Sequence, residues 1–131
     1  MRLALDTSAY SALQLGKAQK LHSLVERAEE LYLPFVVVAE LSVGFARGSK
    51  VGENSRKLEA LLGSDGTSVL YASADTVNLY AEIWAELSRI GKPIPTNDIW
   101  IAALCIQHDC QLATNDEHFE NVPLLQTVTA K

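Results

Sequence analysis

The 131-residue sequence has little cysteine and no long apolar run. Its two cysteines, Cys105 and Cys110, form no Cys-x-x-Cys pair, and a spacing of five places them on different faces of a helix. We expect both thiols to be reduced and buried. No stretch of about 18 apolar residues is present, and Asp6 interrupts the amino terminus before a signal-like segment develops. We therefore expect a cytoplasmic protein without a membrane segment.

The sequence also lacks an excess of positive charge. It has 11 Lys and Arg against 16 Asp and Glu, a net charge of −5. This argues against a protein that simply coats nucleic acid, because such binding depends on neutralising phosphates. The 48% hydrophobic and 21% charged content is typical of a globular protein, and the length predicts a single domain over residues 1–131.

Short apolar segments alternate with helical patterns along the whole chain. Strands are predicted at residues 3–5, 31–33, 68–71, 111–114 and 124–127. Helices are predicted at 10–15, 18–28, 35–48, 51–62, 75–90 and 98–108, with strand an open alternative for the β-branched run at 36–38. This order predicts an α/β three-layer sandwich, in which helices flank a mainly parallel central sheet.

The predicted helix at 75–90 carries an apolar stripe that we interpret as core packing. The stripe consists of Val77, Tyr80, Ala81, Trp84 and Leu87. The same interpretation, packing in a core or at a dimer interface, applies to the other tryptophan, Trp100.

Two carboxylates stand next to apolar segments in unusual positions. Asp6 directly follows the first predicted strand, so its side chain should project into the crevice where α/β folds bind ligands. Helix capping is the alternative for Asp6. Glu40 interrupts an apolar run, where an ionised carboxylate must be paired or bind a cation. The alternative for Glu40 is a solvent-facing position paired with Arg47.

Two further carboxylates lie at predicted element ends. Asp98 precedes the apolar helix IWIAALC, where capping is an equal alternative. Asp116 follows the strand ending at Thr114, where Asn115 and Asp116 are also typical turn residues. If the four acids converge, they form an oxygen site suited to Mg²⁺ or Mn²⁺. Two such ions can activate a water and stabilise a leaving oxygen in phosphodiester cleavage.

Four segments resemble the PIN-domain ribonucleases, and particularly the VapC-type toxins of prokaryotic toxin–antitoxin pairs. The segments are LDTSAY, VVVAELSVGF, IPTNDIWIAA and LATNDEHFENVPLL. They occur in the family's order and approximate spacing and span nearly the whole chain. The resemblance implies a PIN-like fold, Mg²⁺- or Mn²⁺-dependent cleavage of RNA, a homodimer, and inhibition by a small antitoxin.

The resemblance also implies roles for individual residues. The acidic metal-binding positions match Asp6, Glu40, Asp98 and Asp116, of which the fourth is the most variable in the family. Nearby hydroxyl residues that support the site match Thr7 or Ser8 and Thr114, and Asn115 is a weaker neighbour. The resemblance gives His118 a structural place in its His-Phe pair.

The densest basic group follows the Glu40 segment and offers contacts to RNA phosphates or to an acidic partner. It consists of Arg47, Lys50, Arg56 and Lys57, for which a solvated surface is the alternative. Two bound divalent cations would change the net charge from −5 to −1 and so remove much of the repulsion of RNA.

Two other functions remain open from the residues. A phosphotransfer or receiver domain also gathers Asp and Mg²⁺ at strand ends, but LDTSA lacks the second acid of an Asp-x-Asp motif and no Lys follows a late strand before Lys131. A non-catalytic binding module would use the same carboxylates as caps.

Overall fold

Five strands form one sheet in which every neighbouring pair is parallel. The computed structural model describes residues 1–131 and contains β1 (Arg2–Leu5), β2 (Glu30–Pro34), β3 (Thr67–Leu70), β4 (Gln111–Thr114) and β5 (Thr127–Thr129). Their order is β3-β2-β1-β4-β5. The last three residues of the central strand, β1, are fully buried, as expected where helices cover both faces of a parallel sheet.

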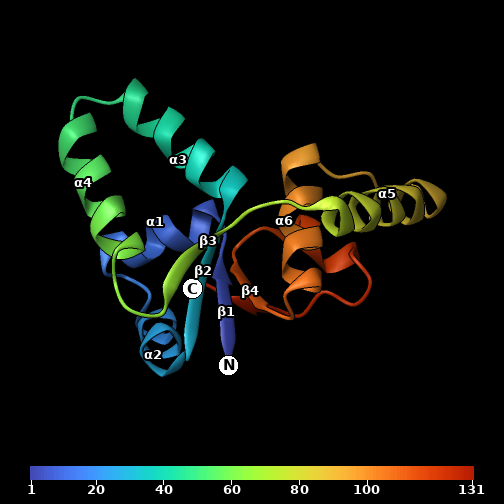
Figure 1. Cartoon of the computed structure of the whole chain (residues 1–131), viewed down its shortest axis with the longest axis horizontal. Coiled ribbons are helices and arrows are strands. Elements are labelled where there is room, and N and C mark those ends of the chain that lie inside the picture. The colour runs from blue at the N-terminus through green and yellow to red at the C-terminus, as the bar shows by residue number, and fades with distance from the viewer.

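Six α-helices cover the two faces of this sheet. They are α1 (Thr7–Leu15), α2 (Gln19–Arg27), α3 (Phe35–Arg47), α4 (Val51–Leu62), α5 (Ala74–Arg89) and α6 (Thr96–Gln107), followed by the 3₁₀-helix η1 (Glu117–Asn121). Figure 1 shows α1, α2 and α4 on one side of the strands and α5 and α6 on the other. The three-layer prediction is confirmed, and the sheet is wholly rather than mainly parallel.

The chain reverses its direction across the sheet between β1 and β4. From β1 it proceeds outward to β2 and β3, and it then crosses the opposite face through α5 and α6 to reach β4 on the other side of β1. This is a topological switch point, where the loops after two adjacent parallel strands diverge to opposite faces and leave a crevice. The backbone N–H of Asp6 donates to the carbonyl of Ala113 at 3.2 Å and so fixes the two strands at this point.

The β-branched run after Pro34 is helical, which settles the alternative at residues 36–38. Val36, Val37 and Leu41 are buried, a spacing that matches one face of a helix. Pro34 ends β2 and occupies the N-cap position of α3, so strand and helix follow one another without a loop. The core comprises 28 buried apolar residues, including both free cysteines, whose predicted burial is confirmed.

The predicted core stripe of α5 is wrong in part. Val77 and Trp84 are 53% and 56% exposed, whereas Thr76, Ile83 and Leu87 form the buried face. Helix α5 packs against α6, and the Thr76 hydroxyl on the buried face donates to Gln107 of α6.

Trp100, in contrast, is partly buried and packs against the core. Its ring lies 4.4 Å from that of Tyr80 and 6.2 Å from that of Phe35, measured between centroids.

Three elements have boundaries that differ from the prediction by two residues or more. Helix α1 begins at Thr7 because Asp6 is its N-cap, and α6 begins at Thr96, directly after Pro95. The last strand lies at Thr127–Thr129 rather than at 124–127, because Leu124 has a positive φ of 67° and is 89% exposed. No helix has the length and apolar content needed to cross a membrane.

Candidate active site at the carboxyl ends of the strands

Asp6 is the most deeply placed carboxylate of the crevice, with 5% of the residue exposed. It follows β1 directly and caps α1 by accepting from the Ala9 N–H at 2.8 Å. The Ser8 hydroxyl donates to the same oxygen at 2.7 Å, and the Thr114 hydroxyl donates to the other oxygen. The capping alternative for Asp6 is therefore correct, and the residue also faces the crevice.

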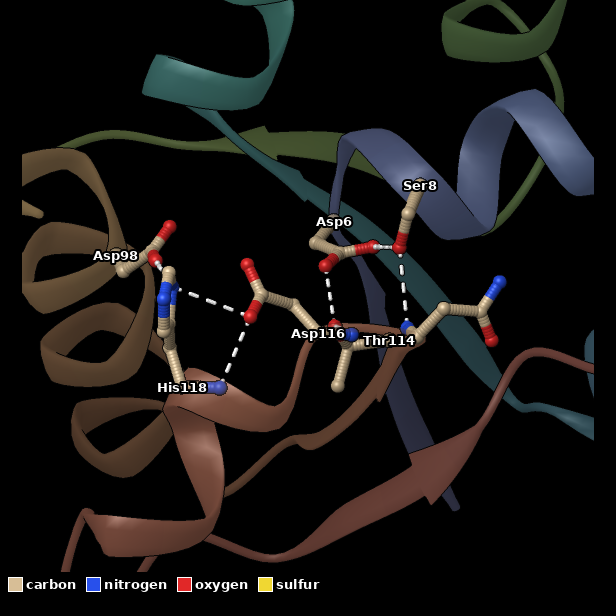
Figure 2. A network of polar contacts seen from close by, with 7 residues as sticks. Asp6, Ser8, Asp98, Thr114, Asp116 and His118 are labelled. Carbon is tan, nitrogen blue, oxygen red and sulfur yellow. Dashed lines mark hydrogen bonds and ion pairs between the residues drawn. The ribbon is translucent and has the colours of Figure 1, made fainter. Parts of the chain in front are cut away.

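Two hydroxyl groups tie Asp6 to the segment that carries Asp116 (Figure 2). Thr114 Oγ1 accepts from the Asp116 N–H at 2.9 Å while it donates to Asp6. Ser8 Oγ accepts from the Asn115 N–H at 3.0 Å while it donates to Asp6. The two strand ends are therefore joined twice through the same carboxylate. Thr114 and Ser8 occupy the supporting positions that were predicted for them, and Asn115 contributes its backbone.

Asp98 and Asp116 reach the crevice from two different elements, α6 and the segment before η1. Asp98 lies in the first turn of α6 and makes no capping hydrogen bond to the helix, so the capping alternative is wrong for this residue. Asp116 precedes η1 and accepts from the His118 N–H at 2.9 Å. The ring atom His118 Nδ1 lies 3.0 Å from an Asp98 oxygen and 3.1 Å from an Asp116 oxygen (Figure 2).

Glu40 completes the acidic set from α3. Its side chain is half-buried and accepts a hydrogen bond of 2.8 Å from the Thr7 hydroxyl. No ion pair joins it to Arg47, so that alternative is wrong. Thr7 thus supports Glu40 while Ser8 supports Asp6, and the first turn of α1 serves both acids.

All four predicted acids line one open pocket of about 300 Å³. Its remaining lining residues are Thr7, Ser8, Ser11 and Ile101. No lysine or arginine forms an ion pair with any of the four acids, and His118 is their one basic neighbour. The acids therefore converge as predicted, without a fixed cation to balance them.

Two of the four acids, Asp6 and Asp98, have a pKa above the ordinary value for aspartate. Burial raises the pKa of Asp6, opposed by its three hydrogen bonds and aided by the charge of Asp116. Burial also raises the pKa of Asp98; the contact with His118 opposes this rise, whereas the charges of Asp116 and Glu40 add to it. A bound cation would relieve both penalties. The donor set, four carboxylates within one pocket, fits a hard divalent ion.

The predicted basic group lies outside this pocket. Arg47, Lys50 and Arg56 are exposed and unpaired, and Lys57 pairs with Glu53 at 3.4 Å on α4. They occupy the α3–α4 hairpin, which Figure 1 shows extending away from the strands. His118, for which the resemblance implies a structural place, contacts two of the acids. Its placement two residues after Asp116 was the available signal.

The comparisons with known proteins agree with this geometry. Residues 3–125 match the sequence profile of the PIN domain family. Ribonuclease VapC1 of Haemophilus influenzae is 34% identical over 100 residues, which cover 75% of this chain and 72% of that protein. The chain belongs to the PIN-domain family, among the VapC ribonucleases. The resemblance found in the four motifs is thereby confirmed, and the phosphotransfer alternative is left without support.

Other VapC proteins and their solved structures match almost the full length. VapC ribonuclease Y4jK of Sinorhizobium fredii is 31% identical, over 87% of this chain and 86% of that protein. The structure of VapBC-1 from nontypeable Haemophilus influenzae superposes with a TM-score of 0.87, 25% identity and coverage of 99% and 98% of the two chains. VapBC2 from Rickettsia felis, bound to a promoter DNA fragment, gives a TM-score of 0.83 at 26% identity, with 98% of each chain covered.

Proposed function

We propose that this VapC protein is an endoribonuclease that hydrolyses RNA phosphodiesters with Mg²⁺ or Mn²⁺ bound by Asp6, Glu40, Asp98 and Asp116. The observation that carries the proposal is their convergence into one pocket, from the ends of β1 and β4 and from α3 and α6, without a lysine or arginine partner. A cation bound there supplies Lewis-acid activation of water and offsets charge on the departing oxygen. Water is the attacking group, so the chain needs no nucleophile of its own.

The four acids differ in how firmly the surrounding residues hold them. Asp6 is fixed by three donors and is the rigid member, since each of its oxygens already has a partner that orients it. Glu40, Asp98 and Asp116 are less buried and can adjust to an ion and a phosphate. Thr7, Ser8 and Thr114 act as positioning residues through the carboxylates that they contact.

The basic group is placed to extend the RNA contact beyond the pocket. Arg47 lies seven residues after Glu40 on α3, which is the same helix face about 10 Å further along the axis. Lys50 precedes α4, and Arg56 and Lys57 lie on it. These side chains bind phosphates on one side of the bond that is cut, and loading the site with two cations reduces the repulsion of RNA.

The protein acts as the toxin of a toxin–antitoxin pair, and a small antitoxin and a second copy of the chain are its protein partners. A groove between α1, α3 and α4 adjoins the acidic pocket, and Ser11 lines both. Its apolar lining residues are Tyr10, Leu15, Leu41 and Phe45, and Leu15 is 68% exposed. An inhibitor segment lying in this groove would reach the pocket. The whole chain is one PIN domain acting on RNA in the cytoplasm.

RNA cleavage by the purified protein tests the enzymatic proposal. The wild type, Asp6→Asn and Asp98→Asn should be compared with Mg²⁺, Mn²⁺ or a chelator. We expect cleavage only by the wild type and only with a divalent ion. Cleavage that survives chelation, or both substitutions, would overturn the mechanism. For the partner, growth arrest on expression should be relieved by co-expressing the short gene adjacent to this one, and equal toxicity with its product present would contradict the pairing.

A further inference from the structure

One basic side chain, His118, lies beside two of the four acids, Asp98 and Asp116. The ligand atoms of Asp98, Asp116 and His118 all lie within 4.8 Å of one another. A single ring nitrogen, Nδ1, faces both carboxylates, at 3.0 Å and 3.1 Å. Figure 2 shows the imidazole beside the carboxylates of Asp98 and Asp116.

The two residues of the His-Phe pair, His118 and Phe119, differ in their exposure to solvent. Phe119 is 2% exposed and anchors η1 in the core, whereas the His118 side chain is 52% exposed. The backbone N–H of His118 bonds to Asp116, so the start of η1 holds this carboxylate and the imidazole together. A residue needed only for packing would face the core. The expectation of a purely structural His118 is not supported by this position.

The donor atoms on the two sides of the pocket differ in kind. Asp6 and Glu40 offer only oxygen, as Mg²⁺ prefers, whereas Asp98 and Asp116 stand beside an imidazole nitrogen. Imidazole is a ligand for transition-metal ions, and the affinity of a mixed nitrogen and oxygen site rises along the series that begins with Mn²⁺. Mg²⁺ gains little from such a nitrogen.

We propose that His118 is a metal-binding residue, which forms with Asp98 and Asp116 a mixed site that prefers a divalent transition-metal ion over Mg²⁺. This inference rests on the proposed function, because it assigns a further ligand to the same metal site. It also names the ion class: an imidazole at this position distinguishes ions that a ring of carboxylates would bind on charge and size alone.

Binding of Mn²⁺ to the purified full chain tests this assignment without an activity assay. Pulsed electron paramagnetic resonance should detect nitrogen coupling to bound Mn²⁺ in the wild type, and ¹⁵N-histidine labelling should change that coupling. His118→Ala should abolish the coupling and weaken Mn²⁺ binding about tenfold or more, while the affinity for Mg²⁺ changes by less than about threefold. His22→Ala removes an exposed imidazole of α2 and should match the wild type in every respect.

The outcomes separate this inference from the proposed function. If Asp98→Asn binds Mn²⁺ as tightly as the wild type, the acidic metal site itself is wrong. If Asp98→Asn loses Mn²⁺ but the wild-type complex shows no histidine nitrogen coupling, only the role of His118 is overturned. The labelling experiment uses the wild type, so it decides the question even if His118→Ala fails to fold.

Discussion

The two ends of the parallel sheet treat charge in opposite ways. At the amino end, the Arg2 guanidinium donates to Glu30 and Tyr32, both at 3.0 Å, and to the His108 carbonyl. The Tyr32 hydroxyl and Arg2 hold the pKa of Glu30 below its ordinary value. Every charge in this group has a partner across neighbouring strands. The group therefore joins β1 to β2 and to the turn before β4.

At the carboxyl end, four carboxylates face one pocket and His118 is their one basic neighbour. The pKa of Asp6 and that of Asp98 are raised by burial and by neighbouring acids. The charges at one end are thus paired across neighbouring strands, while the carboxylates at the other end have no lysine or arginine partner. Carboxylates whose pKa is raised by burial and by neighbouring acids are common at functional sites.

The largest expected effect is on RNA cleavage, when a Glu→Gln substitution at the carboxyl end is compared with the same substitution at the amino end. Glu40→Gln should lower RNA cleavage about 100-fold or more, because a neutral amide is a much weaker cation ligand. Glu30→Gln should leave cleavage within about twofold, since it lies at the other end of β2 from the pocket. Steady-state cleavage rates at saturating Mn²⁺ measure both, and similar losses in the two variants would contradict the division.

A buried hydroxyl at the carboxyl end should matter to both activity and stability. Thr114→Val removes the donor to Asp6 and the acceptor of the Asp116 N–H. We expect a loss of about 1–3 kcal/mol in the free energy of unfolding and about a tenfold slower cleavage. Thr67→Val makes the same change on β3, where the hydroxyl has no hydrogen bond, and should be nearly neutral. Denaturant unfolding and cleavage assays compare the two, and equal effects would show that the Thr114 contacts contribute nothing.

At the amino end, the loss should fall on stability alone. Arg2→Ala leaves Glu30, Tyr32 and the His108 carbonyl without their shared donor. We expect the Tm to fall by about 2–5 °C while metal binding is retained. Arg27→Ala, which removes only a bond to a carbonyl within α2, serves as the control and should shift the Tm less. A drop in Mn²⁺ affinity of the folded Arg2 variant would show that the two ends are coupled.

The smallest effect is a difference in pH dependence in the metal-free protein. The folded-state pKa of Asp6 is raised above 3.8, so the folded protein holds its proton more tightly than the unfolded chain. Stability should therefore fall as pH rises through the interval between these two values, and Asp6→Asn should flatten this slope.

Glu30 should have the opposite effect. The pKa of Glu30 is lowered from 4.5, so its contribution to stability is present above that value and is lost as pH falls through the folded-state pKa. Glu30→Gln should thus change the slope in the opposite sense at pH values below 4.5, and unfolding free energies measured with a chelator between about pH 2.5 and 7 test the pair. Slopes that change alike in the two variants would refute the contrast.

Local patterns in the sequence were enough for most of the fold. The buried strand before Asp6 and the helix after Pro34 depend on apolar spacing and on residues at their own boundaries. The buried face of α5 was not predictable in this way, because apolar residues occur on more than one side and contact with α6 selects Thr76 over Val77. The position of β5 depended on a left-handed residue at Leu124, which its side chain gives no reason to expect.

For the candidate site, too, some features followed from the sequence and others only from the tertiary structure. By itself, the sequence determined which carboxylates follow strands or interrupt apolar helices, because those positions are defined by neighbours along the chain. Their convergence required the order of the strands, since the crevice exists only where the chain reverses between β1 and β4. The hydrogen bond of Thr114 to Asp6 and the contact of His118 with Asp98 were decided by tertiary structure alone, whereas capping by Asp6 is a local contact with Ala9. These two tertiary contacts join residues that are far apart in the chain, so no local sequence pattern predicts them.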